Sequence, residues 1–82
     1  MTEAITLYGT VGCHLCEQAH EMINYLNENG VTDVALNIVD IIEDEELYQR
    51  YELRIPVLQR PGDGAELDWP FEPATVLQFV GR

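Results

Sequence analysis

The stretch AITLYGTVGCHLC, residues 4–16, decides how this chain of 82 residues begins to fold. Residues 4–8 are mostly apolar and favour β structure, and Gly9 follows them, so the pattern predicts a buried strand that ends there. Residues 9–12 predict a short loop. A helical pattern starts at Cys13, which places both cysteines of the chain in the first turn of a helix.

The expected helix after this loop has one apolar face. Five apolar side chains recur with the spacing i, i+4, i+7, i+8 and i+11: Leu15, Ala19, Met22, Ile23 and Leu26. Asn29 and Gly30 predict the end of the helix, with the glycine as its C-terminal cap. Residues 34–39 then predict a second strand, because apolar side chains alternate along it. The face expected to point inward carries Val34, Leu36 and Ile38.

A second, shorter helix is expected after this strand. Asp40 and the acidic residues 43–46 suit the positive end of a helix dipole. The apolar side of the helix is expected to carry Leu47, Tyr48 and Tyr51. The helix must stop before Pro56, because a residue that precedes proline is pushed out of the helical region of backbone space.

The last third of the chain predicts a hairpin and a final helix. Residues 57–59 and 65–68 read as two short strands, and the sequence PGDG at 61–64 is a strong turn signal between them. Pro73 fits the first turn of the last helix. The side chains expected to point inward from it are Val76, Leu77 and Val80.

These elements predict an α/β fold in the order β-α-β-α-β-β-α. The first β-α-β unit requires parallel strands with a right-handed crossover, and the hairpin adds antiparallel strands. The result is a four-stranded mixed sheet flanked by helices. No linker, repeat or low-complexity tract divides the chain, so we expect residues 1–82 to form a single domain.

The charge of the chain is strongly negative. Fifteen Asp and Glu residues stand against four Arg and no Lys, which gives a formal net charge of −11. Such a surface repels nucleic acid and anionic membranes, because both are bound through Lys and Arg. The plain interpretation is an acidic, soluble protein. The sharper one is a preference for neutral or basic partners through electrostatic steering.

The sequence also bears on the compartment. The first nine residues lack the basic and long apolar regions of a signal peptide. No run of about 18 apolar residues is present that would span a membrane. We therefore expect a cytoplasmic protein. We also expect the protein to be a monomer. In a reducing cytosol a lasting structural disulfide is not expected.

The two cysteines have the spacing of a redox pair. Cys13 falls at the start of the expected helix, where free N–H groups and the helix dipole stabilise an anion. A thiolate at such a place has a lowered pKa, and the thiolate is the nucleophile in disulfide exchange. Cys16 follows one turn later and can resolve a mixed disulfide on Cys13. A protonated His14 would favour the thiolate, whereas Glu17 opposes it by repulsion.

Other interpretations of the pair stay open. The cysteines can be two small residues of the core. They can be half of a four-sulfur metal or iron–sulfur site that a second chain or two glutathione thiols complete. The chain can also be a redox-inert interaction module. We expect no metal site within one chain, because His20 lies about 10.5 Å from Cys13 along a helix, too far to share a zinc ion.

The order of the elements, with CHLC after the first strand and RIPV at 54–57 before the third, resembles a glutaredoxin. It is most similar to the short bacterial glutaredoxin-like proteins of the thioredoxin fold, over about residues 4–80. The sequence differs from the usual glutaredoxin in having CHLC in place of CPYC. Residues 68–72, DWPFE, stand where glutaredoxins have two glycines and an aspartate. We expect Trp69 and Phe71 to cover the end of the sheet.

The resemblance implies a thiol–disulfide oxidoreductase and a set of site residues. Cys13 would be the nucleophile and Cys16 the resolving thiol. Pro56 would be a cis-proline facing the cysteines, and the backbone of Ile55 would bind the substrate as an extra short strand. Arg54 would meet a substrate carboxylate, or else pair with acids of this chain. The implied partner is a disulfide-containing protein or a glutathione mixed disulfide, with glutathione as a co-substrate and no resident cofactor.

Overall fold

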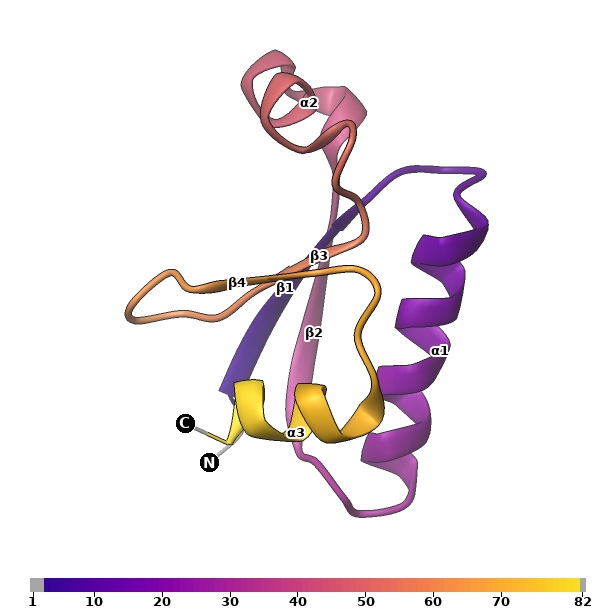
Figure 1. Ribbon diagram of the computed structural model, residues 1–82, viewed down its shortest axis with the longest axis vertical. Helices are drawn as coiled ribbons and strands as arrows, with labels where there is room; N and C mark the ends of the chain where they lie inside the picture. The colour runs from indigo at the N-terminus through magenta and orange to yellow at the C-terminus, as the bar shows by residue number, and fades with distance from the viewer. Residues whose placement is uncertain (1–2, 82) are drawn as a thin grey trace.

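The computed structural model describes residues 3–81, and its elements follow the predicted order (Figure 1). They are β1 (Glu3–Gly9), α1 (His14–Glu28), β2 (Val34–Asp40), α2 (Glu45–Tyr51), β3 (Val57–Gln59), β4 (Glu66–Asp68) and α3 (Pro73–Val80). A short 3-10 helix, η1 (Ile41–Glu43), joins β2 to α2 and is the one element that the sequence pattern did not predict. It exists because the acidic segment is capped twice, by the side chains of Asp40 and Asp44.

The four strands form one mixed sheet in the order β2-β1-β3-β4. β1 pairs in parallel with β2, while β3 runs antiparallel to both β1 and β4. The predicted four-stranded mixed sheet is therefore confirmed. Since β1 is an inner strand, the loop that leaves its C-terminal end begins near the middle of the sheet. This loop carries the chain to the two cysteines.

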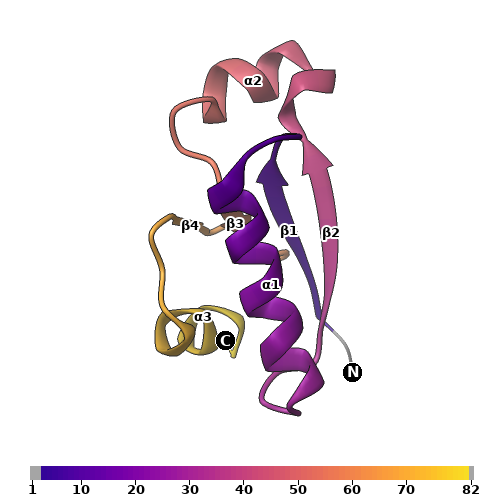
Figure 2. The ribbon, with the colours of Figure 1, turned by 90° about the vertical axis from the view of Figure 1, so that its right-hand side faces the viewer.

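The main core lies between the sheet and the two helices α1 and α3, which share one face of it (Figure 2). Its buried members are Ile5, Leu7, Ala19, Ile23, Leu26, Val34, Leu58, Phe71 and Val76. Trp69 packs against this cluster, with its ring edge-on to Phe71 and the ring centres 5.0 Å apart. The expected role of these two aromatic residues as a cover for the sheet is confirmed.

A second, smaller core fixes α2, which lies at the opposite end of the molecule from α3 (Figure 1). Tyr51 is fully buried between Ile41 and Val57, and it stacks on Tyr8 with ring centres 4.4 Å apart. Successive side chains of a strand point to opposite faces, so Leu7 enters the main core and Tyr8 enters this second one. The short helix α2 is thereby tied to the central strand.

Four apolar positions predicted to be buried are exposed: Leu15, Ile38, Tyr48 and Leu77. In α1 the inward position of the first turn belongs to Cys16, and the neighbouring Leu15 is rotated by about 100° away from the sheet. Ile38 is 54% exposed and lies near the C-terminal end of the edge strand β2. In α2 and α3, Tyr51 and Val76 take the buried positions.

None of the helices within residues 3–81 is long and apolar enough to cross a bilayer.

Candidate functional site

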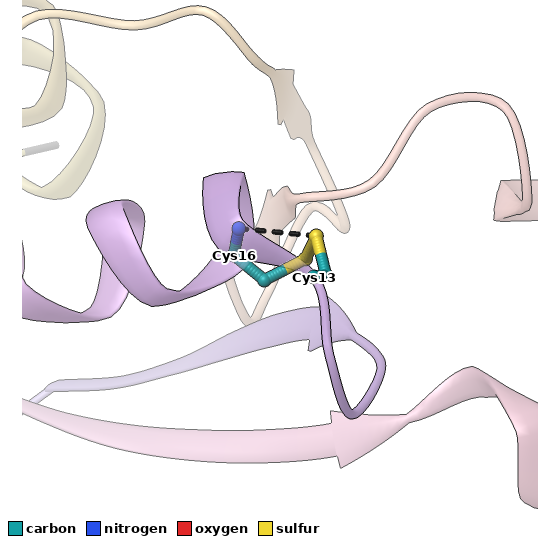
Figure 3. The surroundings of a disulfide bond; sticks show 2 residues. All are labelled: Cys13 and Cys16. Carbon is teal, nitrogen blue, oxygen red and sulfur yellow. Dashed lines mark hydrogen bonds between the residues drawn. A yellow bond between two sulfur atoms is a disulfide. The ribbon is translucent and has the colours of Figure 1, made fainter.

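Both cysteines lie at the N-terminal end of α1, directly after the loop from β1 (Figure 3). Cys13 is the N-cap residue, with an extended backbone, and the helix proper begins at His14. The backbone N–H of Cys16 donates a hydrogen bond to the sulfur of Cys13 at 3.1 Å. The Cys13 sulfur therefore sits where the free N–H groups and the dipole of the helix favour negative charge.

The two sulfurs are joined in a disulfide, with the Cα atoms 5.2 Å apart. Their environments differ. Cys13 is partly exposed, whereas Cys16 is only 8% exposed and belongs to the buried face of α1. An external sulfur can therefore reach Cys13 more readily than Cys16. This asymmetry is what a nucleophile and an internal resolving thiol require.

Gly9 makes room for the buried cysteine. A Cβ atom added at this position would lie 3.0 Å from the Cys16 sulfur and 3.1 Å from the Cys16 Cβ. Such distances are closer than ordinary van der Waals contact, so a larger residue would displace the sulfur or the strand end. The sequence pattern indicated only that Gly9 ends a strand. Its contact with Cys16 depends on how α1 packs across β1, and no local signal reveals that.

We expect Gly9→Ala to destabilise the oxidised protein by about 1–3 kcal/mol, because it overpacks the space beside Cys16. Urea unfolding of the oxidised protein measures this change. In a Cys16→Ala background the same substitution should cost less, because the nearest atom, the sulfur, is then missing. An equal cost in both backgrounds would show that Gly9 is needed for another reason.

The segment before β3 contains the cis-proline that the resemblance implies. The Ile55–Pro56 peptide bond is cis, and Pro56 is buried. That Pro56 faces the cysteines stays a prediction. The Trp69–Pro70 bond is also cis, which the sequence did not indicate. The N–H of Ile55 donates to the carbonyl of Tyr51 at 3.0 Å, so this donor is already used within the chain. Binding of a substrate backbone by Ile55, beside Pro56, stays a prediction that concerns its carbonyl.

Arg54 is held by two acids of the hairpin. Its guanidinium donates to Asp68 through two nitrogens, at 2.8 and 3.1 Å, and to Glu66 at 2.6 Å. It also lies over the ring of Tyr51, 5.1 Å from the ring centre. The interpretation of Arg54 as a partner of nearby acids is therefore confirmed. A role toward a substrate carboxylate stays a prediction, and it would require Arg54 to exchange partners.

The contacts among Tyr51, Arg54, Glu66 and Asp68 shift the pKa values of the tyrosine and the two acids. Hydrogen bonds from Tyr51 and Arg54 lower the pKa of Glu66 below its usual range. The hydrogen bond from Arg54 likewise lowers the pKa of Asp68. Burial, and then the bond to Glu66, raises the pKa of the Tyr51 hydroxyl. The cluster thus ties α2 to β4. The sequence predicted Tyr51 only as an apolar residue of the second helix and did not predict its bond with Glu66, because the two residues are 15 positions apart in the chain.

We expect this cluster to make stability depend on pH. Depressed carboxylate pKa values stabilise the fold above the unfolded values of 4.5 and 3.8, and the gain is lost as pH falls through the lower folded values. Arg54→Met should therefore cost roughly 1 kcal/mol of unfolding free energy at neutral pH, a modest value because the pairs are partly exposed. The cost should shrink toward zero in acid. A cost for Arg54→Met that does not change with pH would contradict the account.

Neither histidine forms part of a metal-binding group in the described part of the chain. His14 is exposed beside Cys13, and His20 is partly buried one turn beyond Cys16. Within residues 3–81, no group of three or more His, Cys, Asp or Glu side chains is arranged to hold a metal ion.

Comparison with known proteins identifies the family. The family model described as "Glutaredoxin-like domain (DUF836)" matches residues 4–80. The X-ray structure of the structural genomics target protein XcR50 from X. campestris is 39% identical, with a TM-score of 0.77 over 94% of this chain and 95% of that one. The solution structure of protein Ne2328 from Nitrosomonas europaea is 25% identical, with a TM-score of 0.78 over 96% and 92% of the two chains.

A mutant thioredoxin from Halobacterium salinarum shares the fold, at 21% identity and a TM-score of 0.70 over 94% of this chain and 70% of that one. The predicted thioredoxin-like fold is thereby confirmed. No curated protein matches the sequence. The fold and the joined cysteine pair fit a redox function. Because the family match spans nearly the whole sequence, the chain belongs to the glutaredoxin-like domain family.

Proposed function

We propose that this protein is a thiol–disulfide oxidoreductase in which Cys13 is the nucleophile and Cys16 the resolving thiol. One observation carries the proposal: the disulfide joins Cys13, a partly exposed residue at a helix N-terminus, to Cys16, a buried residue one turn later. A pair of core cysteines would have no need of an accessible sulfur on the helix cap. The hydrogen bond from the Cys16 N–H to the Cys13 sulfur supports the same assignment.

Reduction of a substrate disulfide by Cys13 and Cys16 proceeds in two steps. The Cys13 thiolate attacks one sulfur of a substrate disulfide, which forms a mixed disulfide and releases the other substrate sulfur as a thiolate. The Cys16 thiol loses its proton and attacks the Cys13 sulfur, which releases the second substrate thiolate and closes the internal disulfide. The substrate gains two electrons and the protein loses two. A dithiol reductant, or two glutathione molecules acting as co-substrate, returns the protein to its reduced form.

The hydrogen bond from the Cys16 N–H to the Cys13 sulfur contributes to exchange in both directions. In the first step the N–H of Cys16 and the helix dipole stabilise the attacking thiolate on Cys13. In the reverse direction they stabilise the same sulfur as a leaving group, since a thiol of lower pKa leaves faster. One geometric feature therefore supports both reduction and oxidation of a substrate. The direction in the cell is set by the reductant.

We propose that the enzyme is a cytoplasmic monomer. We further propose that its main substrate is a protein disulfide and that a glutathione mixed disulfide is a poorer substrate. Glutathione carries two carboxylates, whereas the chain has a net charge of −11. The cation next to the Ile55–Pro56 bond in the chain, Arg54, is already bonded to Glu66 and Asp68. Both observations oppose tight binding of an anionic tripeptide.

A single-turnover reaction tests the proposal. Fully reduced protein is mixed with a peptide that contains one internal disulfide, and the reaction is quenched with an alkylating agent and read by mass. We expect one peptide to be reduced for each Cys13–Cys16 disulfide that forms. The control is free glutathione at the same thiol concentration. A peptide that is reduced no faster by the protein than by glutathione contradicts the proposed function.

A further inference from the structure

A hollow of about 430 Å³ opens between the first turns of α1 and the C-terminal ends of β1 and β2. Cys16 forms part of its wall, so the hollow lies directly behind the disulfide. Its apolar surface includes Val11, from the loop before Cys13, and Ile38, from the edge strand β2. These side chains are 88% and 54% exposed, so the described chain leaves them uncovered.

The same hollow is lined by three acidic side chains: Glu17 from α1, Asp40 from the end of β2 and Glu43 from η1. The ion pairs within residues 3–81 use Glu66, Asp68 and Asp63, so none of the three acids of the hollow has a basic partner there. One oxygen of Asp40 accepts a hydrogen bond from the N–H of Ile42 at 3.0 Å. The hollow thus combines apolar side chains with three carboxylates. Its other titratable lining residues are His20 and Cys16.

We propose that this hollow receives an arginine or lysine side chain of the protein whose disulfide Cys13 attacks. The inference rests on the proposed function and deepens it, because it names basic disulfide proteins as the substrate class. A long basic side chain has the two parts that the hollow matches. Its aliphatic stem would lie along Val11 and Ile38, and its charged head would meet the carboxylates of Glu17 and Glu43.

The occupant follows from charge complementarity and from position. A neutral apolar side chain would leave the three carboxylates of the hollow without a basic partner, whereas a cation would pair with them. An acidic side chain would be repelled by the hollow and by the net charge of −11. Since Cys16 forms part of the wall, a bound side chain lies close to the reacting disulfide. A basic residue near the substrate cysteine is therefore held in place while exchange occurs.

A binding experiment on the oxidised protein tests the hollow apart from its chemistry. N-acetyl-arginine amide is titrated while backbone amide signals are followed by NMR, and N-acetyl-citrulline amide serves as the uncharged isostere. We expect saturable shifts at Gly12, Glu17 and Ile38 with arginine, and binding about five-fold weaker or more with citrulline, as for a partly exposed ion pair. Equal shifts with both compounds, or none at these residues with either, would overturn the proposal.

Matched variants separate the hollow from the overall charge. E17Q/E43Q removes two charges from the hollow, and E28Q/E52Q removes two exposed charges elsewhere. We expect the first variant to weaken arginine binding about five-fold and the second to leave it within about two-fold. An equal loss in both variants would mean that the net charge alone attracts the cation, and would refute the site.

The closed disulfide cannot react with these thiol-free probes, so the binding result does not depend on the proposed function. The connection between the hollow and disulfide reduction is then tested by mixing the reduced protein with two disulfide peptides. The peptides differ only in carrying arginine or citrulline at one position. Faster reduction of the arginine peptide, lost in E17Q/E43Q and kept in E28Q/E52Q, supports the substrate class. Equal rates refute it. If neither peptide is reduced, the proposed function fails, and the titration still decides whether the hollow binds a cation.

Discussion

Cys13→Ser is expected to abolish thiol–disulfide exchange, with a fall in rate of roughly a thousand-fold or more, because it removes the attacking thiolate. Cys13 is the partly exposed member of the pair, and its sulfur lies at the N-terminal end of α1. A serine hydroxyl at this position is not ionised at neutral pH and cannot form a mixed disulfide. The single-turnover reaction with a disulfide peptide measures the loss.

The fold should survive this substitution. Serine is a favourable N-cap residue, and its oxygen can accept the bond that the Cys16 N–H now donates to sulfur. Circular dichroism and thermal unfolding against the reduced wild-type protein are the controls. A folded Cys13→Ser protein that still exchanges at the normal rate would show that the nucleophile has been assigned to the wrong cysteine.

Cys16→Ser is expected to stop the reaction halfway and trap a covalent adduct on Cys13. The first step needs only the accessible Cys13 sulfur, whereas the second needs the buried thiol of Cys16. We expect nearly stoichiometric mixed disulfide between the variant and the peptide, detected by mass, while the wild-type protein shows almost none. The adduct should disappear on addition of dithiothreitol.

The matched control for trapping is the double variant Cys13→Ser/Cys16→Ser. It should form no adduct at all, which shows that the peptide is held through Cys13. If Cys16→Ser releases reduced peptide as fast as the wild-type protein does, an external thiol resolves the intermediate. The role given to Cys16 would then be wrong.

The order of the elements could be predicted because each one has a local signal. A short apolar run that favours β structure marked β1, alternating apolar residues marked β2, and the spacing from Leu15 to Leu26 marked α1. The PGDG turn marked the hairpin of β3 and β4. These signals do not state how a helix is rotated against the sheet. For that reason Leu15 was predicted to be buried, although Cys16 occupies the inward position.

The features of the candidate site that depend on residues close in sequence could be predicted. The features that depend on packing between separate elements could not. The placement of the cysteine pair at a helix start follows from residues 9–16 alone, and the structure has Cys13 as the N-cap. The contact of Gly9 with Cys16 depends on packing between two elements. The bonds that hold Arg54 depend on where β4 returns beside β3, which is a matter of tertiary structure. The hollow behind Cys16 has the same origin, since four separate elements, β1, α1, β2 and η1, line it.

The reduction potential of the Cys13–Cys16 pair tests the central claim most directly. The protein is equilibrated in a series of glutathione redox buffers, quenched with an alkylating agent, and its species are read by mass. The account predicts a reversible two-electron transition between about −120 and −270 mV, the range of disulfide oxidoreductases. A pair that forms no disulfide even in the most oxidising buffer would contradict the account and leave CHLC without a redox role.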